Sequence, residues 1–425
     1  MTTLRVVVDE LIVDGSSGSR RYAEELARQI IATAPAGTEV EGIVSNLPQE
    51  AIDELSARLP GIARLTKLPL ARRELTVAWQ SGLAVPGASG MIHAPTLFAP
   101  LRKHDRGEGD QTTVTIHDVL PWTHPESLPS GSVMWHKAMA KRARKFADAV
   151  VVPTHAVADR LAEFVDLGDR IRVIGGAPAS TLRLPADADE RAERLGLPAQ
   201  YAFTLGSIMP RKGIAPLIRA VARPEALGIP LLIAGPDRYG DGSATGVAAA
   251  AGLPEDRVRA LGQLDDDDLA VALDRATVFV FPSVAEGFGL PIVEAFKFGT
   301  PVIHSDDPAL VEVAAGASLI VERPRSRRPR KTKTRTRSVS PRPSDVSSPM
   351  TPSAPGWRCS PPTVRVPSAG GTPPSVSGSC TPTSEQAVQA FHDQAAQPAS
   401  TDARLGRSTE VDASSGCSDR PNDAR

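Results

Sequence analysis

The sequence predicts an α/β protein with two Rossmann-like, doubly wound domains that face a cleft, followed by a disordered C-terminal tail. Short apolar runs alternate with amphipathic helical patterns from the N-terminus onward. This alternation restarts after a segment rich in Gly, Pro and Ala at residues 176–187, and the composition changes abruptly after Glu322. We therefore expect an N-terminal domain at residues 1–175, a linker at 176–187, a C-terminal domain at 188–322 and the tail at 323–425.

The first domain starts with a buried-strand signal, the apolar run Leu4–Val8. A helical pattern follows over Ser19–Ala32, where Tyr22, Leu26 and Ile30 share one face. The other elements expected in this domain are strands at Glu39–Val44, Met91–His93, Thr113–His117, Ala149–Val152 and Ile171–Ile174, and helices at Ser132–Phe146 and His155–Phe164. Strands that alternate with helices in this way are typical of a parallel sheet covered by helices on both faces.

The second domain repeats this alternation. Its expected strands are Tyr201–Leu205, Pro230–Ala234, Val258–Ala260, Thr277–Phe281 and Pro301–His304, and its expected helices are Ile214–Ala222, Asp266–Arg275 and Pro291–Phe298. In open parallel sheets, ligands bind beyond the carboxyl ends of the strands. We therefore expect functional residues in the loops that follow these strands.

The tail differs from the rest of the chain in composition and charge. It contains all three cysteines and 15 of the 39 prolines, and it carries 16 Lys and Arg against 8 Asp and Glu, which leaves 32 against 41 for residues 1–322. Its apolar surface is too small to offset the entropy of ordering, so we expect disorder. The basic run Arg325–Arg337 is typical of a solvated tail, with a nucleic-acid or anionic-lipid patch as the alternative. Because the change falls inside a βα pattern, a reading-frame shift in the gene is a third interpretation.

Several classes of protein are excluded by what the sequence lacks. No apolar run reaches the roughly 20 residues of a membrane span, and the N-terminus does not have the pattern of a secretory signal. Three cysteines are too few for a disulfide framework. The HExxH, CxxC and GxSxG motifs are absent, so the sequence carries no signal for a metal site or a serine-hydrolase elbow.

The segment Pro282–Gly299, PSVAEGFGLPIVEAFKFG, carries the strongest functional signal. Glycines let a backbone approach a ligand closely, and a helix N-terminus offers free N–H groups to a phosphate. Glu286 and Glu294 are eight residues apart, and a carboxylate can accept paired hydrogen bonds from the vicinal hydroxyls of a ribose or a hexose. The alternative is a solvent-facing pair of glutamates at a helix start, where negative charge is favoured. Together with the glycine turn, the pair favours a ligand site.

The segment Leu205–Gly213, LGSIMPRKG, is the second candidate. A strand ends in a turn that begins at Gly206, and Arg211 and Lys212 come just before a helix. Two adjacent cations at the mouth of a parallel sheet suit a diphosphate, because they neutralise the charge of a leaving group. The alternative is an ordinary surface Arg–Lys pair, but the position beyond a strand end favours function.

Two weaker candidates lie in the first domain. His117 ends a predicted strand in the segment Thr115–Glu126 and could hydrogen-bond a substrate hydroxyl or assist proton transfer, with a capping or core histidine as the alternative. The loop Asp14–Arg21, DGSSGSRR, has neither the GxGxxG nor the GxxxxGK[ST] motif. Its Gly15 and Gly18 could still bring backbone N–H groups to a ligand, and the alternative is a flexible connection.

In this order, the four segments resemble the retaining GT-B glycosyltransferases, and most closely the large family 4 group of nucleotide-sugar-dependent enzymes. The most specific match is the E-x7-E motif, EGFGLPIVE, followed by AFKFGTPVI. The supporting matches are TLGSIMPRKGIAPLI, LLIAGP, VRALGQLDDDDLAVAL, TIHDVLPWTHPE and ADAVVVPTHAVADRL. Together the matches cover about residues 4–322.

The resemblance implies a role for each part of the E-x7-E motif. In such enzymes the first glutamate contacts the hydroxyls of the donor sugar, which corresponds to Glu286. The last glutamate binds the ribose, which corresponds to Glu294. The backbone amides of the glycine turn bind the diphosphate, which corresponds to Phe288, Gly289 and Leu290.

The resemblance also assigns the remaining candidates. The basic pair, Arg211 and Lys212, holds the phosphates, and His117 lies near the transferred sugar. The N-terminal glycine loop, with Gly15 and Gly18, approaches the sugar and the acceptor. The residues expected to bind the donor are Gly15, Gly18, Gly206, Arg211, Lys212, Glu286, Phe288, Gly289, Leu290 and Glu294. The chemistry is expected to depend on His117, Glu286, Arg211 and Lys212.

The implied function is transfer of a hexose, mannose-like or similar, from a nucleotide diphosphate sugar to an acceptor hydroxyl, with retention, in cell-envelope or polysaccharide synthesis. The first domain would bind the acceptor and the second the donor. The expected partners are the nucleotide-sugar donor, a glycan or lipid-linked acceptor and, as a peripheral contact, the inner surface of the membrane, but no nucleic acid. No cofactor or metal is expected, because two cations and the amide groups replace a metal. The expected location is the cytoplasm, free or at the inner face of the membrane.

Two departures from the family pattern leave other functions open. Family members continue past the strand at Ala317–Val321 with further helices, whereas here the tail follows, and the loop DGSSGSRRY is longer than the compact GGIGRY form. The alternatives are an inactive remnant that binds nucleotide sugars, a nucleotide-sugar epimerase on the same two-domain plan, and a nucleic-acid binder that uses the basic tail.

Overall fold

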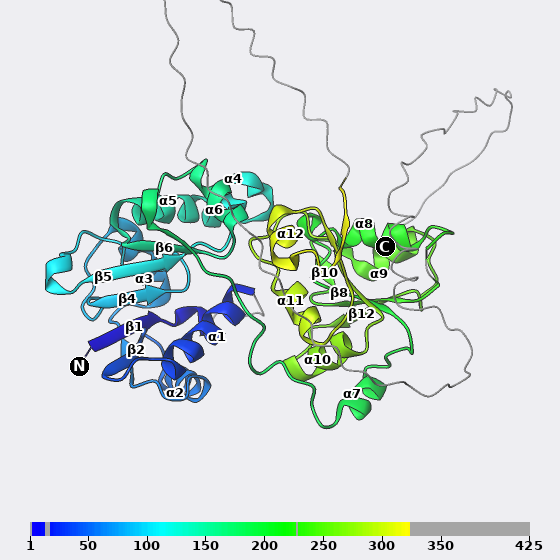
Figure 1. Cartoon of the computed structure of the whole chain (residues 1–425), viewed down its shortest axis with the longest axis horizontal. Helices are drawn as coiled ribbons and strands as arrows, with labels where there is room; N and C mark the ends of the chain where they lie inside the picture. Colours follow the sequence, from blue (N-terminus) through cyan, green and yellow to red (C-terminus); the bar gives the residue numbers. More distant parts are fainter. Residues whose placement is uncertain (1, 13–17, 227, 324–425) are drawn as a thin grey trace, which may run out of the picture. The chain divides into compact units, whose positions relative to one another are not determined.

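The structure is a computed structural model that describes residues 2–12, 18–226 and 228–323. Two parallel sheets with their helices make up this part of the chain, which confirms the predicted two-domain α/β fold (Figure 1). Residues up to Glu322 belong to one compact unit. The predicted tail from residue 324 onward lies outside the described residues, as does Gly15.

The first sheet has the strand order β3-β2-β1-β4-β5-β6-β7, with all strands parallel. The strands are β1 (Thr2–Val7), β2 (Thr38–Val44), β3 (Arg64–Lys67), β4 (Met91–Ala94), β5 (Gln111–Thr115), β6 (Ala149–Val152) and β7 (Ile171–Val173). The helices are α1 (Gly18–Ala32), α2 (Gln49–Arg58), α3 (Arg72–Ser81), α4 (Leu120–Thr123), α5 (Ser130–Phe146) and α6 (His155–Ala162). The strand order reverses between β1 and β4, which is where ligands bind in sheets of this kind.

This sheet has a separate hydrophobic core on each face, because successive side chains of a strand point to opposite faces. Val6 and Val8 pack with buried residues of α1 and α2. Val7, between them, packs with buried residues of α3, α5 and α6. Burial on both faces explains why the strand reads as a continuous apolar run in the sequence.

The second sheet has the order β12-β9-β8-β13-β14-β15 and is also parallel. The strands are β8 (Ala202–Leu205), β9 (Leu231–Ala234), β12 (Val258–Gly262), β13 (Val278–Phe281), β14 (Val302–Ser305) and β15 (Leu319–Val321). The helices are α7 (Ala188–Arg194), α8 (Ile214–Val221), α9 (Ala244–Ala250), α10 (Asp266–Asp274), α11 (Leu290–Lys297) and α12 (Pro308–Ala314). An antiparallel pair, β10 (Arg238–Tyr239) and β11 (Gly242–Ser243), forms a separate ribbon. In this sheet the order reverses between β8 and β13.

The two faces of the second sheet are again packed differently. Phe279 and Phe281 of β13 lie in a core with α10 and α11, whereas Val278 and Val280 lie in a core with α8 and α9. The alternation along one strand therefore anchors helices on both sides of the sheet. Helix packing on both faces thus fixes the position of β13, and the loop that carries Glu286 begins at its carboxyl end.

Some elements of the first domain were not predicted. Strand β3 (RLTK) has no fully buried residue, and α2 buries only Leu55 completely among its ten residues, so neither leaves a clear apolar pattern. Strand β5 ends at Thr115, which is two residues earlier than predicted, and His117 therefore lies in the loop beyond it. In residues 2–12, 18–226 and 228–323, every helix falls short of the length or the apolar composition of a membrane span.

Candidate active site

The basic pair and the first glutamate of the E-x7-E motif meet at the carboxyl end of the second sheet. Strands β8 and β13 are neighbours at the reversal of strand order, so the loops that follow them start side by side. Arg211 and Lys212 lie in a 3-10 turn after β8, and Glu286 lies in the loop after β13. Lys212 Nζ lies 2.6 Å from Glu286 Oε1, and Arg211 Nη1 lies 3.3 Å from the same oxygen.

Ser283 completes this cluster and was not predicted from the sequence. Its hydroxyl donates a hydrogen bond to Glu286 Oε1 at 2.6 Å, and the residue is fully buried. The backbone N–H of Val284 donates to the carbonyl of Arg211 at 2.7 Å, which joins the two loops directly. The sequence signal for Ser283 is weak, because it is only a small polar residue two positions beyond a strand.

The cluster has an excess of positive charge. Burial opposes the ionisation of Glu286, but the charges of Lys212 and Arg211 outweigh it and hold the pKa of the carboxyl below its ordinary value. Two cations therefore face one carboxylate. The Nε of Arg211 is buried and makes no hydrogen bond within the described residues. A cluster of this composition can hold an anion through charge-assisted hydrogen bonds.

Helix α11 begins directly after the loop of Glu286. Phe288 and Gly289 precede its first turn, and Leu290 is its first residue. The N–H groups of these three residues donate to no acceptor in the part of the chain that the structure describes. Gly289 has a φ of 90°, in the left-handed region that glycine adopts without strain. Free N–H groups at a helix start favour an anion, so this turn adds to the positive potential of the basic pair.

Glycines shape the turn after β8. The N–H of Gly206 donates to the carbonyl of Ala234 at 2.8 Å, which ties the end of β8 to β9. Gly213 has a φ of 69° and lies so close to the next loop that a Cβ atom would overlap the carbonyl oxygen of Pro282. These two contacts hold Arg211 and Lys212 between β9 and the loop of Glu286.

The second glutamate of the motif has a different partner. Glu294 is 3% exposed, and its Oε1 lies 3.0 Å from Nη2 of Arg21 on α1. The Nη1 of the same arginine lies 3.0 Å from Asp266 Oδ1 at the start of α10. Burial raises the pKa of Glu294, and the charge of Arg21 opposes this shift. Arg21 was not predicted, because nothing in the sequence relates position 21 to position 294.

His117 is held by a backbone carbonyl. Its Nε2 lies 2.8 Å from the carbonyl oxygen of Pro95, and its ring meets Tyr22 edge-on with the centroids 4.8 Å apart. Burial lowers the pKa of His117, so the ring is neutral at pH 7. Because a carbonyl only accepts, Nε2 carries the hydrogen and Nδ1 keeps its lone pair. The ring is therefore prepared to accept a hydrogen bond at Nδ1.

His117 is also next to the loop of Glu286. A Cβ atom on Gly287 would overlap the carbonyl oxygen of His117, so this position accepts only glycine without a shift of one backbone. The hydroxyl of Thr154 donates to the carbonyl of Gly287 at 3.0 Å. Of the two glycines in the loop Asp14–Arg21, Gly18 is described and is the first residue of α1.

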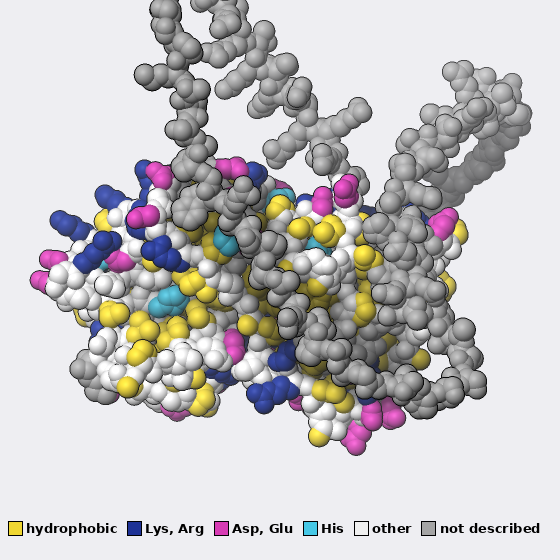
Figure 2. Space-filling model, viewed as in Figure 1, with side chains coloured by type: hydrophobic (Ala, Val, Ile, Leu, Met, Phe, Trp, Pro, Cys, Tyr) yellow, Lys and Arg dark blue, Asp and Glu magenta, His cyan; other side chains and the backbone are white. Residues whose placement is uncertain are grey.

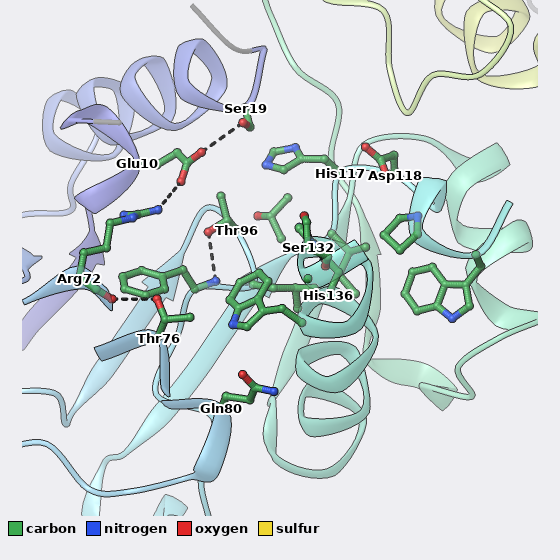
Figure 3. Close-up of a pocket in the computed structure, with 18 residues that line it drawn as sticks. Glu10, Ser19, Arg72, Thr76, Gln80, Thr96, His117, Asp118, Ser132 and His136 are labelled. Atoms are coloured by element: carbon green, nitrogen blue, oxygen red, sulfur yellow. Dashed lines mark hydrogen bonds and ion pairs between the residues drawn. The ribbon is translucent and has the colours of Figure 1, made fainter. Parts of the chain in front are cut away.

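A cavity of about 630 Å³ opens at the carboxyl ends of β1, β4 and β5 in the first domain (Figure 3). Figure 3 shows that Glu10 and His117 come from different elements and border the same space. Glu10 Oε2 accepts a hydrogen bond from Arg72 Nη2 at 3.0 Å, and the guanidinium of Arg72 lies 4.5 Å from the ring centre of Phe98. The Nε1 of Trp135 is buried without a hydrogen bond in the described ranges. The wall thus combines aromatic faces with fixed polar groups, the combination typical of sites for polyhydroxylated ligands.

Two family models match the chain. The model described as Glycosyltransferase Family 4 matches residues 16–176, and the model described as Glycosyl transferases group 1 matches residues 187–327. The boundary between the two matches falls between β7 and α7, where the chain passes from the first sheet to the second.

Curated relatives and solved structures show similarity as well. The chain is 29% identical over 239 residues to the O-antigen chain mannosyltransferase B of Escherichia coli, covering 55% of this chain and 61% of that protein. It is 30% identical over 176 residues to the MMP alpha-(1->4)-mannosyltransferase of Mycolicibacterium hassiacum, covering 41% of each. The chain thus spans less than two thirds of the length of either relative.

The fold is similar to that of a sucrose-phosphate synthase from Thermosynechococcus elongatus, with a TM-score of 0.56 and 23% identity over 76% of this chain and 86% of that one. It is also similar to the Anabaena protein HepE, solved in complex with UDP and glucose, with a TM-score of 0.53 and 17% identity over the same shares of the two chains. At these identities the likeness concerns the fold.

Proposed function

The chain belongs to the GT-B glycosyltransferases of family 4, and we propose that it transfers a hexose from a nucleotide diphosphate sugar to an acceptor hydroxyl. The observation that carries this proposal is the convergence of Arg211, Lys212 and Glu286 next to the free N–H groups at the start of α11. Mannose is the proposed hexose, because two relatives are named as mannosyltransferases. A role in polysaccharide synthesis is supported by the name of the O-antigen relative.

The proposed chemistry depends on stabilising the leaving nucleoside diphosphate. Negative charge develops on the diphosphate as the bond to the sugar breaks, and preorganised cations and N–H groups stabilise such charge without reorganisation. Arg211, Lys212 and the amides of the turn before α11 would provide this stabilisation. We propose that these groups take the role that a metal ion has in other transferases. Glu286 would hold the sugar hydroxyls, and retention of configuration is proposed from the family.

The acceptor is proposed to bind in the cavity of the first domain. The cavity offers a carboxylate on Glu10, aromatic faces and the free Nδ1 lone pair of His117, all suited to the hydroxyls and C–H faces of a sugar. A glycan, or the glycan part of a lipid-linked acceptor, is the proposed ligand. His117 would accept a hydrogen bond from a hydroxyl near the transferred sugar.

Replacing the two motif glutamates is expected to separate binding from turnover. Glu294→Ala should raise the Kd for the donor about 10- to 100-fold, because a buried carboxylate that binds two ribose hydroxyls is worth about 1.5–3 kcal/mol. Glu286→Ala should instead lower kcat about 100-fold with a smaller change in Kd, since its contacts are made to the reacting sugar. Calorimetric titration and initial rates, with the donor selected by thermal shift from a panel of nucleotide sugars, measure both effects.

The matched control is Glu225→Ala, which removes an exposed glutamate of the same domain. Unchanged kinetics in both motif variants would contradict the proposed donor site.

An assay with radiolabelled donor distinguishes a transferase from an epimerase. A labelled hexose attached to acceptor indicates transfer, whereas a labelled isomer of the donor formed without acceptor indicates an epimerase.

Helix α5 supports a peripheral contact with an anionic membrane surface at the inner face of the membrane. Its sequence, SGSVMWHKAMAKRARKF, has five basic residues and no acidic one, although residues 1–322 are acidic overall. Figure 2 shows Lys and Arg side chains gathered over the part of the first domain that holds α5 and β5. Met134 on this helix is 68% exposed. Basic side chains near an anionic leaflet each contribute about 1 kcal/mol to binding.

The double variant Lys141→Gln/Lys145→Gln is therefore expected to weaken binding to phosphatidylserine vesicles about 20- to 30-fold at low salt. Co-sedimentation with vesicles of increasing phosphatidylserine content measures the partition coefficient, and Lys67→Gln on β3 is the control for an exposed lysine elsewhere. Equal binding of the variant and the unmodified protein would contradict a role for α5. Equal competition by duplex DNA would show a general polyanion surface rather than a lipid contact.

A further inference from the structure

Arg21 joins two carboxylates at the position proposed for the donor ribose. One of its terminal nitrogens, Nη2, lies 3.0 Å from Glu294 Oε1, and the other, Nη1, lies 3.0 Å from Asp266 Oδ1. The arginine comes from the start of α1 in the first domain, whereas Glu294 and Asp266 belong to α11 and α10 of the second. The contact therefore places a cation of one domain on the carboxylate proposed to bind the donor in the other.

The geometry leaves part of Glu294 available. Within the described residues, the ion pair with Arg21 is the one polar contact of this carboxylate, and it involves Oε1 only. Oε2 is thus unoccupied on a side chain that is 3% exposed. Arg21 Nε and Nη2 are both buried and make no hydrogen bond in the described ranges, so the contact of Nη2 with Glu294 is an ion pair without hydrogen-bond geometry. Both side chains can therefore form further hydrogen bonds without breaking the ion pair.

We infer that Arg21 is a positioning residue for the donor: it holds one oxygen of Glu294 and thereby presents the other to the ribose diol of the nucleotide. This inference rests on the proposed role of Glu294. A diol donates two hydrogen bonds, and an ionised carboxylate accepts them whereas a protonated carboxyl accepts fewer. Arg21 acts through Glu294 and makes no contact with the sugar that is transferred.

The electrostatic surroundings agree with this role. Burial and the charge of Asp266 raise the pKa of Glu294, whereas the charges of Arg21 and Lys297 lower it. These three side chains are the charged groups that face the carboxyl from α1, α10 and α11. Without Arg21, burial and Asp266 would act against Lys297 alone. The pKa of Glu294 would rise further, and at a given pH a larger fraction of the carboxyl would be protonated.

The test is a double-mutant cycle on nucleotide binding. GDP and UDP serve as probes, each compared with its 2′-deoxy form by calorimetric titration on the full chain. Arg21→Met is expected to raise the Kd for the ribonucleotide about tenfold and to reduce its preference over the deoxynucleotide. In the Glu294→Gln background the same substitution should have no further effect, because its target is already uncharged. Arg21→Lys should restore part of the affinity.

The pH dependence gives a readout that a purely structural role would not produce. In Arg21→Met, affinity should rise with pH as the further raised pKa of Glu294 is passed and the carboxylate forms. The unmodified protein, whose Glu294 ionises at lower pH, should reach its plateau earlier. The phosphates of the nucleotide titrate in the same way with every variant. Glu294→Gln, measured at the same pH values, gives the pH dependence that comes from the phosphates alone, which can then be subtracted.

Three results would overturn the inference. Arg21→Met could bind the nucleotide as tightly as the unmodified protein or more tightly, which would mean that the nucleotide has to displace Arg21 from Glu294. The substitution could have the same effect in the Glu294→Gln background, so that it acts independently of Glu294. Asp266→Asn, which removes a competing acceptor and should not weaken binding, could weaken it as much as Arg21→Met does. Unchanged affinity of Glu294→Gln itself would instead contradict the proposed donor site.

Discussion

Lys212→Met is expected to lower kcat about 100- to 1,000-fold while raising the Kd for the nucleotide much less. Lys212 Nζ is 2.6 Å from Glu286 Oε1, and Arg211 approaches the same oxygen. Charge on the leaving diphosphate is largest in the transition state, so a preorganised cation stabilises that state more than the bound donor. Losing one such group typically costs about 2.7–4 kcal/mol of the activation barrier, which corresponds to this fall in rate.

Rates under saturating donor and acceptor, together with calorimetric Kd values, separate the two effects of Lys212→Met. Lys67→Met is the matched control, because Lys67 is an exposed lysine on β3 of the other domain. Lys212→Arg should retain more activity than Lys212→Met, since it keeps the charge but changes the shape of the donor group. A kcat for Lys212→Met within about threefold of the unmodified protein would refute the role of this cation in leaving-group stabilisation.

The cluster around Glu286 was predictable because its members follow strands. Arg211, Lys212 and Glu286 lie just beyond the carboxyl ends of apolar runs, and parallel strands place all such ends at one edge of the sheet. The sequence did not reveal that β8 and β13 are adjacent. That adjacency follows from the reversal of the strand order, which a linear pattern does not encode.

The contacts that the sequence did not predict join segments that are far apart in the chain. Arg21 and Glu294 are far apart in the sequence, and an arginine on an amphipathic helix has no distinctive pattern. Ser283 was missed for a different reason, since one buried hydroxyl leaves no periodic signal. The cavity beside His117 depends on loops after three strands and on α5, so it exists only in the folded domain. Local propensity predicts elements, whereas such contacts arise from tertiary packing.

The domain boundaries were expected from the change in composition along the chain. β7 ends at Val173 and α7 begins at Ala188, and the expected linker lies between them. The Gly and Pro content that suggested the linker also has a packing role. Gly176 lies against Leu290 and the ring of Phe288, where a Cβ atom would have neighbours at 3.1 Å and 3.3 Å.

Gly213→Ala is expected to destabilise the second domain by about 3 kcal/mol or more and to reduce turnover as well. Gly213 has a φ of 69°, which costs an L-residue about 1–2 kcal/mol. A Cβ atom would in addition overlap the carbonyl oxygen of Pro282, so the backbone of one loop has to move. Lys212 precedes Gly213 directly, and Pro282 lies four residues before Glu286. Any movement that relieves the overlap therefore separates the cation from its carboxylate.

Gly299→Ala isolates the part of this effect that comes from the backbone conformation. Gly299 has a φ of 72°, almost the same as Gly213, but no atom lies within 4 Å of its would-be Cβ position. Gly299→Ala should therefore lower the free energy of unfolding by only about 1–2 kcal/mol and the Tm by about 2–8 °C, with kcat unchanged. Thermal unfolding and initial rates of both variants give the comparison. If Gly213→Ala lowered Tm and kcat no more than Gly299→Ala does, the close approach of the two loops would not be what holds Lys212 against Glu286.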